Sequence, residues 1–416
     1  MKAIPPSRAL PLCVVMLLAG GVIMSLASSP YMAVVLDHHS VWYFFLRQSA
    51  WSVLGIVAFL VAAWVKTERL RKLRYVLFVG AIGLLVMVLL PGFGKSMSGS
   101  ARWIGTGSIS IQPSEVMKLA WVIFAADLTA RRAGSDRPAK EALFPVVGLL
   151  TLTGGLIMLQ PDLGTTMVIV GITFVLLLGS GVRGRAVAGT AAGFMAAGAV
   201  LAVAAPYRRE RLLSFLHPFS HAQTAGYQVA QSLISLGTGH TVGVGFGQGT
   251  AYWGFLPQAN TDFIFSTIGQ QTGIVGALVV LGLLAFLTWT GFRVAQAAPN
   301  RFEALLALGI TAWIGGETIL NIGTSLGVLP VTGVPLPLIS YGGSALVATM
   351  AGLGILYDIA VHGERGLRTV ADGGSGRTRA GAAAKGTGRA DSGARSGTRR
   401  KAAYARSGAA VAGGSG

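Results

Sequence analysis

The sequence has few charged residues, and acidic residues are the scarcer kind. Only 12% of its 416 residues are Asp, Glu, Lys or Arg, whereas soluble domains carry about 25%. A soluble protein of this length could not cover its surface with so few charged side chains. This scarcity excludes an ordinary soluble domain and predicts that lipid surrounds much of the chain.

Cysteine is almost absent as well. Cys13 is the single cysteine, so no internal disulfide and no cysteine-based metal site can form. The chain has 33 basic residues against 15 acidic ones, a net charge of +18, which in a soluble protein would suggest nucleic acid. Here the positive residues lie in short connections between apolar runs and in a tail, which favours anionic lipid headgroups. We therefore expect no nucleic acid among its partners.

Long apolar runs dominate what remains. Ten of them approach the ~20 residues needed to cross the hydrocarbon core of a bilayer. The predicted spans are 9–27, 49–65, 75–90, 116–130, 143–159, 165–178, 187–205, 264–289, 304–326 and 344–359. The first follows Lys2 and Arg8 like a signal peptide, but nine further spans favour an uncleaved signal anchor. We predict an all-α polytopic membrane protein of about ten transmembrane helices.

Lysine and arginine gather in alternate connections. The segments after the second, fourth, sixth, eighth and tenth spans are basic, so the positive-inside rule places them and both termini in the cytoplasm. The odd-numbered loops then face outward, including the large loop 206–263 between spans seven and eight. That loop carries Arg208, Arg209 and Arg211, which is compatible with translocation because long loops cross regardless of charge.

The composition changes near His362. Residues 362–416 contain eleven Lys and Arg, three Asp and Glu, and Tyr404 as the sole aromatic residue. Such a segment cannot form a hydrophobic core. We predict a membrane domain over 1–361 and a disordered basic cytoplasmic tail over 362–416, suited to lipid attraction or partner docking.

Four polar clusters fall in or beside the outward loops. In the first, Glu115 and Lys118 are three residues apart, so they share a helix face and can neutralise each other inside the membrane. Ser114 looks like the start of that helix. The simpler interpretation of the pair is structural. Arg102 beside Trp103 fits a phosphate site and an interfacial anchor equally well.

The second and fourth clusters read as rigid turns. Gln160 and Asp162 lie in a tight Pro-Gly turn, where Asp162 can cap the following span, and capping alone would explain the turn. The fourth cluster contains Ser340, Tyr341 and Gly342 after a proline-rich stretch, a composition suited to lining a groove. Upstream, Glu317 and Asn321 share one face of span nine, where an interhelical hydrogen bond is expected.

The third cluster holds Asp262, the only carboxylate between Glu210 and Glu303. It stands where the large outward loop enters span eight, next to the aromatic residues Phe263 and Phe265. A carboxylate in this position could abstract a proton or ligate a hard divalent ion beside a pyrophosphate. It could equally be the N-cap of span eight, and position alone favours the cap.

Together these clusters resemble the SEDS family of bacterial peptidoglycan glycosyltransferases, which includes FtsW, RodA and SpoVE. The resemblance runs from the first span to Ile359, with its motifs in the family's order. They are Arg102-Trp103-Ile104 with Gln112-Pro113-Ser114-Glu115, Gln160-Pro161-Asp162-Leu163-Gly164-Thr165, Leu256-Pro257 with Thr261-Asp262-Phe263-Ile264-Phe265, and Ser340-Tyr341-Gly342-Gly343-Ser344. Tyr207-Arg208-Arg209 and Gly226-Tyr227-Gln228 look closer to FtsW and SpoVE than to RodA.

The resemblance implies that Asp262 is catalytic and that the protein polymerises lipid II on the outer face of the bacterial cytoplasmic membrane, releasing undecaprenyl pyrophosphate. Asp262 would act as general base on the acceptor hydroxyl, with inversion at the donor carbon. Arg102, Arg208 and Arg209 are candidates for holding the pyrophosphate, and Mg²⁺ or Mn²⁺ could assist. The other expected substrate-binding residues are Trp103, Ser340, Tyr341 and Gly342, with Glu115, Lys118, Gln160 and Asp162 in supporting roles. A class B penicillin-binding protein is the expected partner.

Some positions depart from the family pattern. His217 replaces an aspartate, Asn260 a histidine, Gln270-Gln271 a pair of glutamates and Ala345 a serine. These losses leave Asp262 as the lone acid near the loop and argue against a metal site built from several carboxylates. Two other classes of function compete with the enzyme. A lipid II flippase would carry ionisable residues through a mid-membrane cavity, and a non-catalytic scaffold would not need Asp262.

Overall fold

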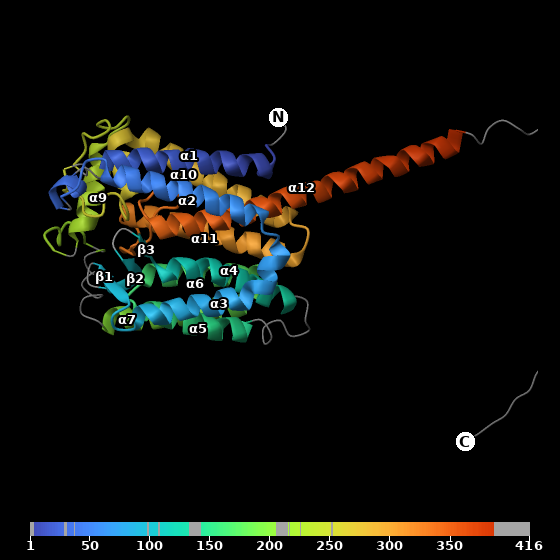
Figure 1. The fold of residues 1–416 in the computed structure, drawn as a ribbon, viewed down its shortest axis with the longest axis horizontal. Helices are drawn as coiled ribbons and strands as arrows, with labels where there is room; N and C mark the ends of the chain where they lie inside the picture. The colour runs from blue at the N-terminus through green and yellow to red at the C-terminus, as the bar shows by residue number, and fades with distance from the viewer. Residues whose placement is uncertain are drawn as a thin grey trace, which may run out of the picture. The chain divides into compact units, whose positions relative to one another are not determined.

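The computed structural model describes residues 4–28, 31–36, 38–97, 100–106, 109–132, 143–204, 215, 217–224, 226–250 and 253–386. Helices dominate it, as the composition predicts (Figure 1). Each predicted span overlaps a separate helix. These helices are α1 (Pro6–Ser28), α2 (Tyr43–Trp64), α3 (Thr67–Leu89), α4 (Pro113–Arg132), α5 (Phe144–Leu159), α6 (Leu163–Gly179), α7 (Gly184–Ala204), α10 (Ile264–Ala297), α11 (Arg301–Ser325) and α12 (Gly343–Gly386).

Length and hydropathy identify six described helices that could cross a membrane, namely α1, α2, α3, α10, α11 and the part of α12 over Gly343–Glu364. The shorter helices α5 and α6 are also apolar. The chain is therefore a multi-pass membrane protein. The count of ten spans and the cytoplasmic placement of the termini stay predictions.

Burial separates the inner helices from the outer ones. In the most apolar 18-residue stretch of each helix, 78% of α11 is buried but only 22% of α10. Helix α11 packs against α4, α6 and α10, and nearly every side of α4 is buried. Helices α2, α3 and α10 expose many Val, Leu and Ile side chains, which in a membrane protein is the surface that faces lipid. The core thus forms around α4 and α11.

Short elements in three of the loops were not predicted. The loop 92–114 folds into an antiparallel sheet of β1 (Gly94–Met97), β2 (Ser100–Thr106) and β3 (Ile109–Ile111), in that order. The large loop holds α9 (Tyr227–Thr238), and η1 (Met32–Leu36) forms one π-helical turn. These elements are short and lie among glycines, so they give almost no periodic signal. The sheet and α9 lie at the same end of the bundle (Figure 1).

Helix α10 contains a break that an apolar run does not reveal. Gly273 has φ 70° and ψ −172° inside the helix. The loop that follows α9 fills the gap: the amides of Val244 and Gly245 donate to the carbonyls of Gln270 and Gln271, at 3.0 and 3.1 Å. In return, the amide of Ile274 donates to the His240 carbonyl at 3.1 Å. The backbone groups that the break releases are therefore satisfied, as a membrane environment requires.

By internal contacts the chain divides into two units, Met1–Gly366 and Leu367–Gly416. The first contains every element from α1 to α11 together with the membrane-length part of α12. The predicted membrane domain 1–361 stays a prediction. Helix α12 extends to Gly386, so residues 362–386 of the predicted disordered tail are helical. Residues 387–416 lie outside the described residues, and the disorder of the tail stays a prediction.

Candidate functional site

The main chain around Asp262 is fixed by the fourth polar cluster. The hydroxyl of Ser340 donates to the carbonyl of Thr261 at 2.6 Å, and the amide of Tyr341 donates to the carbonyl of Asn260 at 2.8 Å. The side-chain amide of Asn321, on α11, donates to the carbonyl of Asp262 at 2.9 Å. Three consecutive carbonyls are thus held from outside their own segment, so the third and fourth clusters form one site.

Asp262 does not occupy the cap position of α10. The helix begins at Ile264 with Phe263 as its N-cap, so the carboxylate stands one residue before the cap. Its side chain is half-buried, and a Cβ on Gly333 would lie 3.8 Å from its Oδ2 atom. Gly333 has φ 72°, a conformation that favours glycine. The proline-rich loop therefore passes close to the carboxylate without a side chain in between.

The first and second clusters also meet. Asp162 caps α6, as predicted, because its Oδ1 accepts from the amide of Thr165 at 3.1 Å. Its Oδ2 accepts from Gln112 Nε2 at 3.1 Å and from the hydroxyl of Ser114 at 3.2 Å. Helix α4 begins at Pro113, one residue before the predicted start at Ser114. Asp162 therefore joins the starts of α4 and α6.

Arg102 is engaged by the protein itself. Its Nε donates to the carbonyl of Gln160 at 2.9 Å, and its Nη2 donates to the carbonyl of Pro161. The side-chain amide of Gln160 in turn donates to the carbonyl of Leu85 at 3.1 Å. Arg102 thus anchors β2 to the α5–α6 turn, and Trp103 lies beside it in β2, opposite Lys95. Their predicted contacts with substrate stay predictions.

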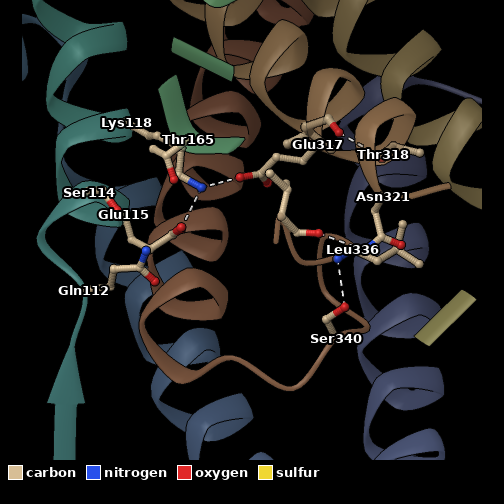
Figure 2. Close-up of polar contacts among 12 residues, drawn as sticks. Gln112, Ser114, Glu115, Lys118, Thr165, Glu317, Thr318, Asn321, Leu336 and Ser340 are labelled. Carbon is tan, nitrogen blue, oxygen red and sulfur yellow. Dashed lines mark hydrogen bonds and ion pairs between the residues drawn. The ribbon is translucent and has the colours of Figure 1, made fainter. Parts of the chain in front are cut away.

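A buried ionic triad links α4 to α11. Lys118 Nζ lies 2.8 Å from the carboxylate of Glu115, which confirms the predicted pair, and it also bonds Glu317 of α11. All three side chains are almost completely buried. Figure 2 shows Lys118 between the two glutamates, with Asn321 one turn farther along α11. The triad and the Asp262 segment therefore share α11 as their support.

The glutamines that replace the family's acidic pair are buried and bonded. Gln270 Nε2 donates to the hydroxyls of Thr238 and Thr250, at 2.8 Å each. Gln271 Nε2 donates to the carbonyl of Ala27, at the end of α1, at 2.8 Å. Both residues precede the break at Gly273, so they hold the first segment of α10 to its neighbours.

An apolar groove of about 450 Å³ runs along α10, lined by residues of α9, α10 and α11. On α10 its lining extends from Phe265 to Leu281, on both sides of the break at Gly273. Ile274 and Leu278, which line it, are 55% and 58% exposed. Exposed apolar residues on a membrane helix contact lipid, so the groove opens toward the bilayer. Its end at Phe265 lies three residues from Asp262.

Some predicted residues cannot be placed. Arg208 and Arg209 lie outside the described residues. Among the residues that are described, no three His, Cys, Asp or Glu side chains gather closely enough to hold a metal ion. For two residues that support the site, the sequence predicts the orientation but not the bonding partners. Glu317 and Asn321 were expected to face the bundle, but the partners Lys118 and Asp262 are 199 and 59 residues away, with no local signal.

Comparison with known proteins identifies the family of this chain. The family model described as "Cell cycle protein", named for FtsW, RodA and SpoVE, matches residues 8–365. A Mycobacterium tuberculosis protein named "Probable peptidoglycan glycosyltransferase FtsW" is 37% identical over 342 residues, which cover 82% of this chain and 65% of that protein. The chain thus spans slightly less than two thirds of that relative. "Stage V sporulation protein E" of Bacillus subtilis is 34% identical over 86% of this chain and 98% of its own length.

Solved structures with a similar fold point to the same family. A chain of the structure titled "Structural coordination of polymerization and crosslinking by a peptidoglycan synthase complex" matches with a TM-score of 0.71 at 29% identity, covering 86% of this chain and 98% of that one. Thermus thermophilus RodA, a rod shape determining protein, matches with a TM-score of 0.62 at 27% identity, covering 84% and 95%. Because sequence and structure agree along nearly the whole described bundle, the protein is a member of the FtsW, RodA and SpoVE family of cell cycle proteins.

Proposed function

We propose that the protein is a peptidoglycan glycosyltransferase that polymerises lipid II into β-1,4 glycan strands. The observation that carries the proposal is the fixed Asp262 segment, in which three consecutive carbonyls are bonded by Asn321, Ser340 and Tyr341. A general base must be held within hydrogen-bond reach of the proton it removes. The relatives named as peptidoglycan glycosyltransferases support the same activity.

In this mechanism the Asp262 carboxylate accepts the proton of the acceptor's sugar hydroxyl. The hydroxyl oxygen attacks the anomeric carbon of the donor, and the bond to the lipid pyrophosphate breaks. One direct displacement inverts the configuration at that carbon. Arg208 and Arg209 remain candidates for the pyrophosphate. For Arg102 this role would require it to reach the phosphates while bonded to the carbonyls of Gln160 and Pro161.

The lipid chain needs its own site. The groove along α10 opens toward the bilayer, and its lining begins at Phe265, three residues after Asp262 in the sequence, which supports an isoprenoid chain as its occupant. Mg²⁺ or Mn²⁺ stays a prediction. The described residues do not gather the carboxylates of a protein-built divalent site, so no step here passes through a metal ion.

Membrane side and partner also belong to the proposal. Lys and Arg asymmetry supports an Asp262 end that faces outward from the cytoplasmic membrane, with both termini in the cytoplasm. The matched chain from a peptidoglycan synthase complex supports a partner that crosslinks the strands, a class B penicillin-binding protein. The basic tail could add contacts with lipid or with other division or elongation proteins.

The deciding experiment is lipid II polymerisation by the purified protein with its penicillin-binding partner. We expect glycan chains from the wild type and none from Asp262→Asn. Glu68→Gln removes an exposed carboxylate at the opposite end of the bundle and should leave activity intact. Circular dichroism, thermal unfolding and complex formation check the fold of each variant.

Equal chains from wild type and Asp262→Asn would remove Asp262 from the mechanism. If neither made chains while a related enzyme did, the activity would be wrong for this protein. Transport of lipid II by the protein in liposomes would then favour a flippase, and full division or elongation in cells carrying Asp262→Asn would favour a scaffold.

A further inference from the structure

A second charged site lies at the end of the bundle opposite Asp262. Asp127, near the end of α4, is surrounded by three arginines, Arg71 and Arg74 from the start of α3 and Arg131 from the last turn of α4. We call these four residues the Asp127 cluster. None of them takes part in the proposed reaction, and the cluster is argued here independently of it.

The carboxylate organises the arginines. Arg71 Nε lies 2.6 Å from Oδ1 of Asp127, and the Nε atoms of Arg74 and Arg131 lie 2.7 and 2.8 Å from Oδ2. Two rings orient the guanidinium planes further: Arg74 stacks 4.3 Å from the ring centre of Tyr75, and Arg71 lies 5.3 Å from that of Phe302. In each pair with Asp127 the inner nitrogen Nε is the one nearest to the carboxylate. Nη1 of Arg74 donates to the carbonyl of Arg71, and the Arg74 side chain is 12% exposed, so Arg71 and Arg131 are the exposed arginines of the cluster.

The cluster carries more positive charge than the carboxylate can balance. Three guanidinium groups and one carboxylate leave a formal charge of +2. Asp127 is 2% exposed, whereas the side chains of Arg71 and Arg131 are 42% and 49% exposed. The neighbouring acid Glu303 is buried and bonded to the hydroxyl of Thr67 at 2.6 Å. One arginine would suffice to neutralise Asp127, so helix packing alone does not explain three.

We propose that the Asp127 cluster binds a phosphate group, that of an anionic phospholipid headgroup. Guanidinium forks match the geometry of phosphate oxygens, and arginine is less strongly hydrated than lysine. The buried carboxylate fixes the arginines beforehand, which lowers the conformational cost of binding. The site lies where the apolar run of α3 begins, and in the proposed positive-inside orientation it would face the anionic cytoplasmic leaflet.

The test measures lipid binding to the full-length protein in detergent by native mass spectrometry, with phosphatidylglycerol as the probe and phosphatidylcholine as the zwitterionic reference. Removal of one arginine near an anionic lipid surface costs about fivefold in affinity. We therefore expect Arg131→Gln and Arg71→Gln to weaken phosphatidylglycerol binding about fivefold each. Arg131→Lys, which keeps the charge but loses the fork, should fall in between.

Arg293→Gln is the matched control. Arg293 lies near the end of α10, at the same end of the bundle, and stacks 5.0 Å from the ring centre of Trp289 outside the cluster. It loses the same charge and should bind phosphatidylglycerol like the wild type. Equal weakening in all three Gln variants would overturn the proposal, because it would show attraction by net charge alone. Thermal unfolding without lipid checks that each variant is folded.

The source of the phosphate is tested in parallel. If inorganic phosphate or glycerol 3-phosphate competes with phosphatidylglycerol at equal concentration, phosphate recognition stands and the lipid tail contributes nothing. If the cluster variants keep full lipid binding but lose a cytoplasmic acidic protein segment in a pull-down, the proposal is wrong and the surface is a protein-binding one.

Discussion

Asn321 holds the carbonyl oxygen of Asp262 at 2.9 Å and the carbonyl oxygen of Val334 at 2.8 Å with the same side-chain nitrogen. One amide of an interior helix therefore joins the loop that carries the proposed base to the proline-rich loop beside it. Because α11 packs on three helices of the core, the position of Asp262 depends on the middle of the bundle and not only on its own loop.

Asn321→Leu should impair catalysis through position. The substitution keeps the branched shape and the number of heavy atoms but leaves two carbonyls without their donor, which costs about 1–3 kcal/mol for each buried group. We expect kcat for lipid II polymerisation to fall about tenfold or more while KM changes little, as for a loss of transition-state geometry. Steady-state polymerisation assays of wild type and variant measure both constants.

Thr318→Val provides the control for this change. Thr318 lies one turn earlier on α11, and its hydroxyl donates to the carbonyl of Ile314 in its own helix at 2.8 Å. Its removal should leave kcat within about twofold of the wild type, since no bond to the Asp262 segment is lost. A rise in KM with unchanged kcat for Asn321→Leu would contradict a positioning role.

The ionic triad predicts an asymmetry between two substitutions. Lys118→Met leaves Glu115 and Glu317 buried without their cation, which should cost about 3–5 kcal/mol of unfolding free energy. Glu317→Gln instead leaves the Lys118–Glu115 pair, at 2.8 Å, electrically balanced, so we expect a much smaller loss. Thermal unfolding of the purified variants in detergent compares them. Equal loss in both would show that the triad stabilises through packing and not through charge.

Gly273→Ala should destabilise the helix break. Gly273 has φ 70°, and an added Cβ would overlap the carbonyl oxygen of Thr241. Backbone strain and overlap together should cost about 2–4 kcal/mol. Gly282→Ala is the matched control, because Gly282 lies on the same helix with nothing within 4 Å of an added Cβ. It should be neutral or gain up to about 1 kcal/mol. Thermal unfolding distinguishes the two, and equal stability would refute the strained junction.

How far the sequence predicts this fold depends on how many residues separate the side chains that come into contact. Apolar runs locate the helices because lipid imposes length and hydropathy on each one separately. The Glu115–Lys118 pair is visible because three residues bring two side chains to one helix face. The third member, Glu317, is 199 residues from Lys118, and no local rule could choose it among the other polar residues.

The candidate site shows the same limit. Asp262 stands out as an isolated acid, but position alone favours an N-cap, and only the resemblance to a family reversed that interpretation. Beside Trp103, Arg102 fits a phosphate site and an interfacial anchor equally well from the sequence. Its bonds to the carbonyls of Gln160 and Pro161 arise from the tertiary fold. The break at Gly273 was hidden because a run of apolar residues around a glycine reads as one continuous helix.

Replacing the two glutamines before the break by glutamate, the residue usual in the family, should change the stability of the protein differently at each position. In Gln270→Glu the hydroxyl of Thr250 can turn and donate to a carboxylate, and that of Thr238 can do so in place of its bond to the carbonyl of Ser235, so the folded state should tolerate the change better. In Gln271→Glu a carboxylate would face the carbonyl of Ala27, which the amide now bonds at 2.8 Å. That repulsion and the lost bond should cost about 1–3 kcal/mol. Thermal unfolding at neutral pH compares them, and the reverse order would show that the hydroxyls cannot reorient.

The groove along α10 predicts a selective effect on the lipid substrate. Leu278 and Val279 are adjacent and similarly exposed, at 58% and 55%, but only Leu278 lines the groove. Leu278→Trp should displace part of the isoprenoid chain and raise KM for lipid II about fourfold for each methylene group excluded. Val279→Trp introduces the same side chain outside the groove and should leave KM unchanged. A substrate with a chain too short to reach Leu278 should not distinguish wild type from Leu278→Trp. If both variants behave alike with the full-length chain, the isoprenoid lies elsewhere.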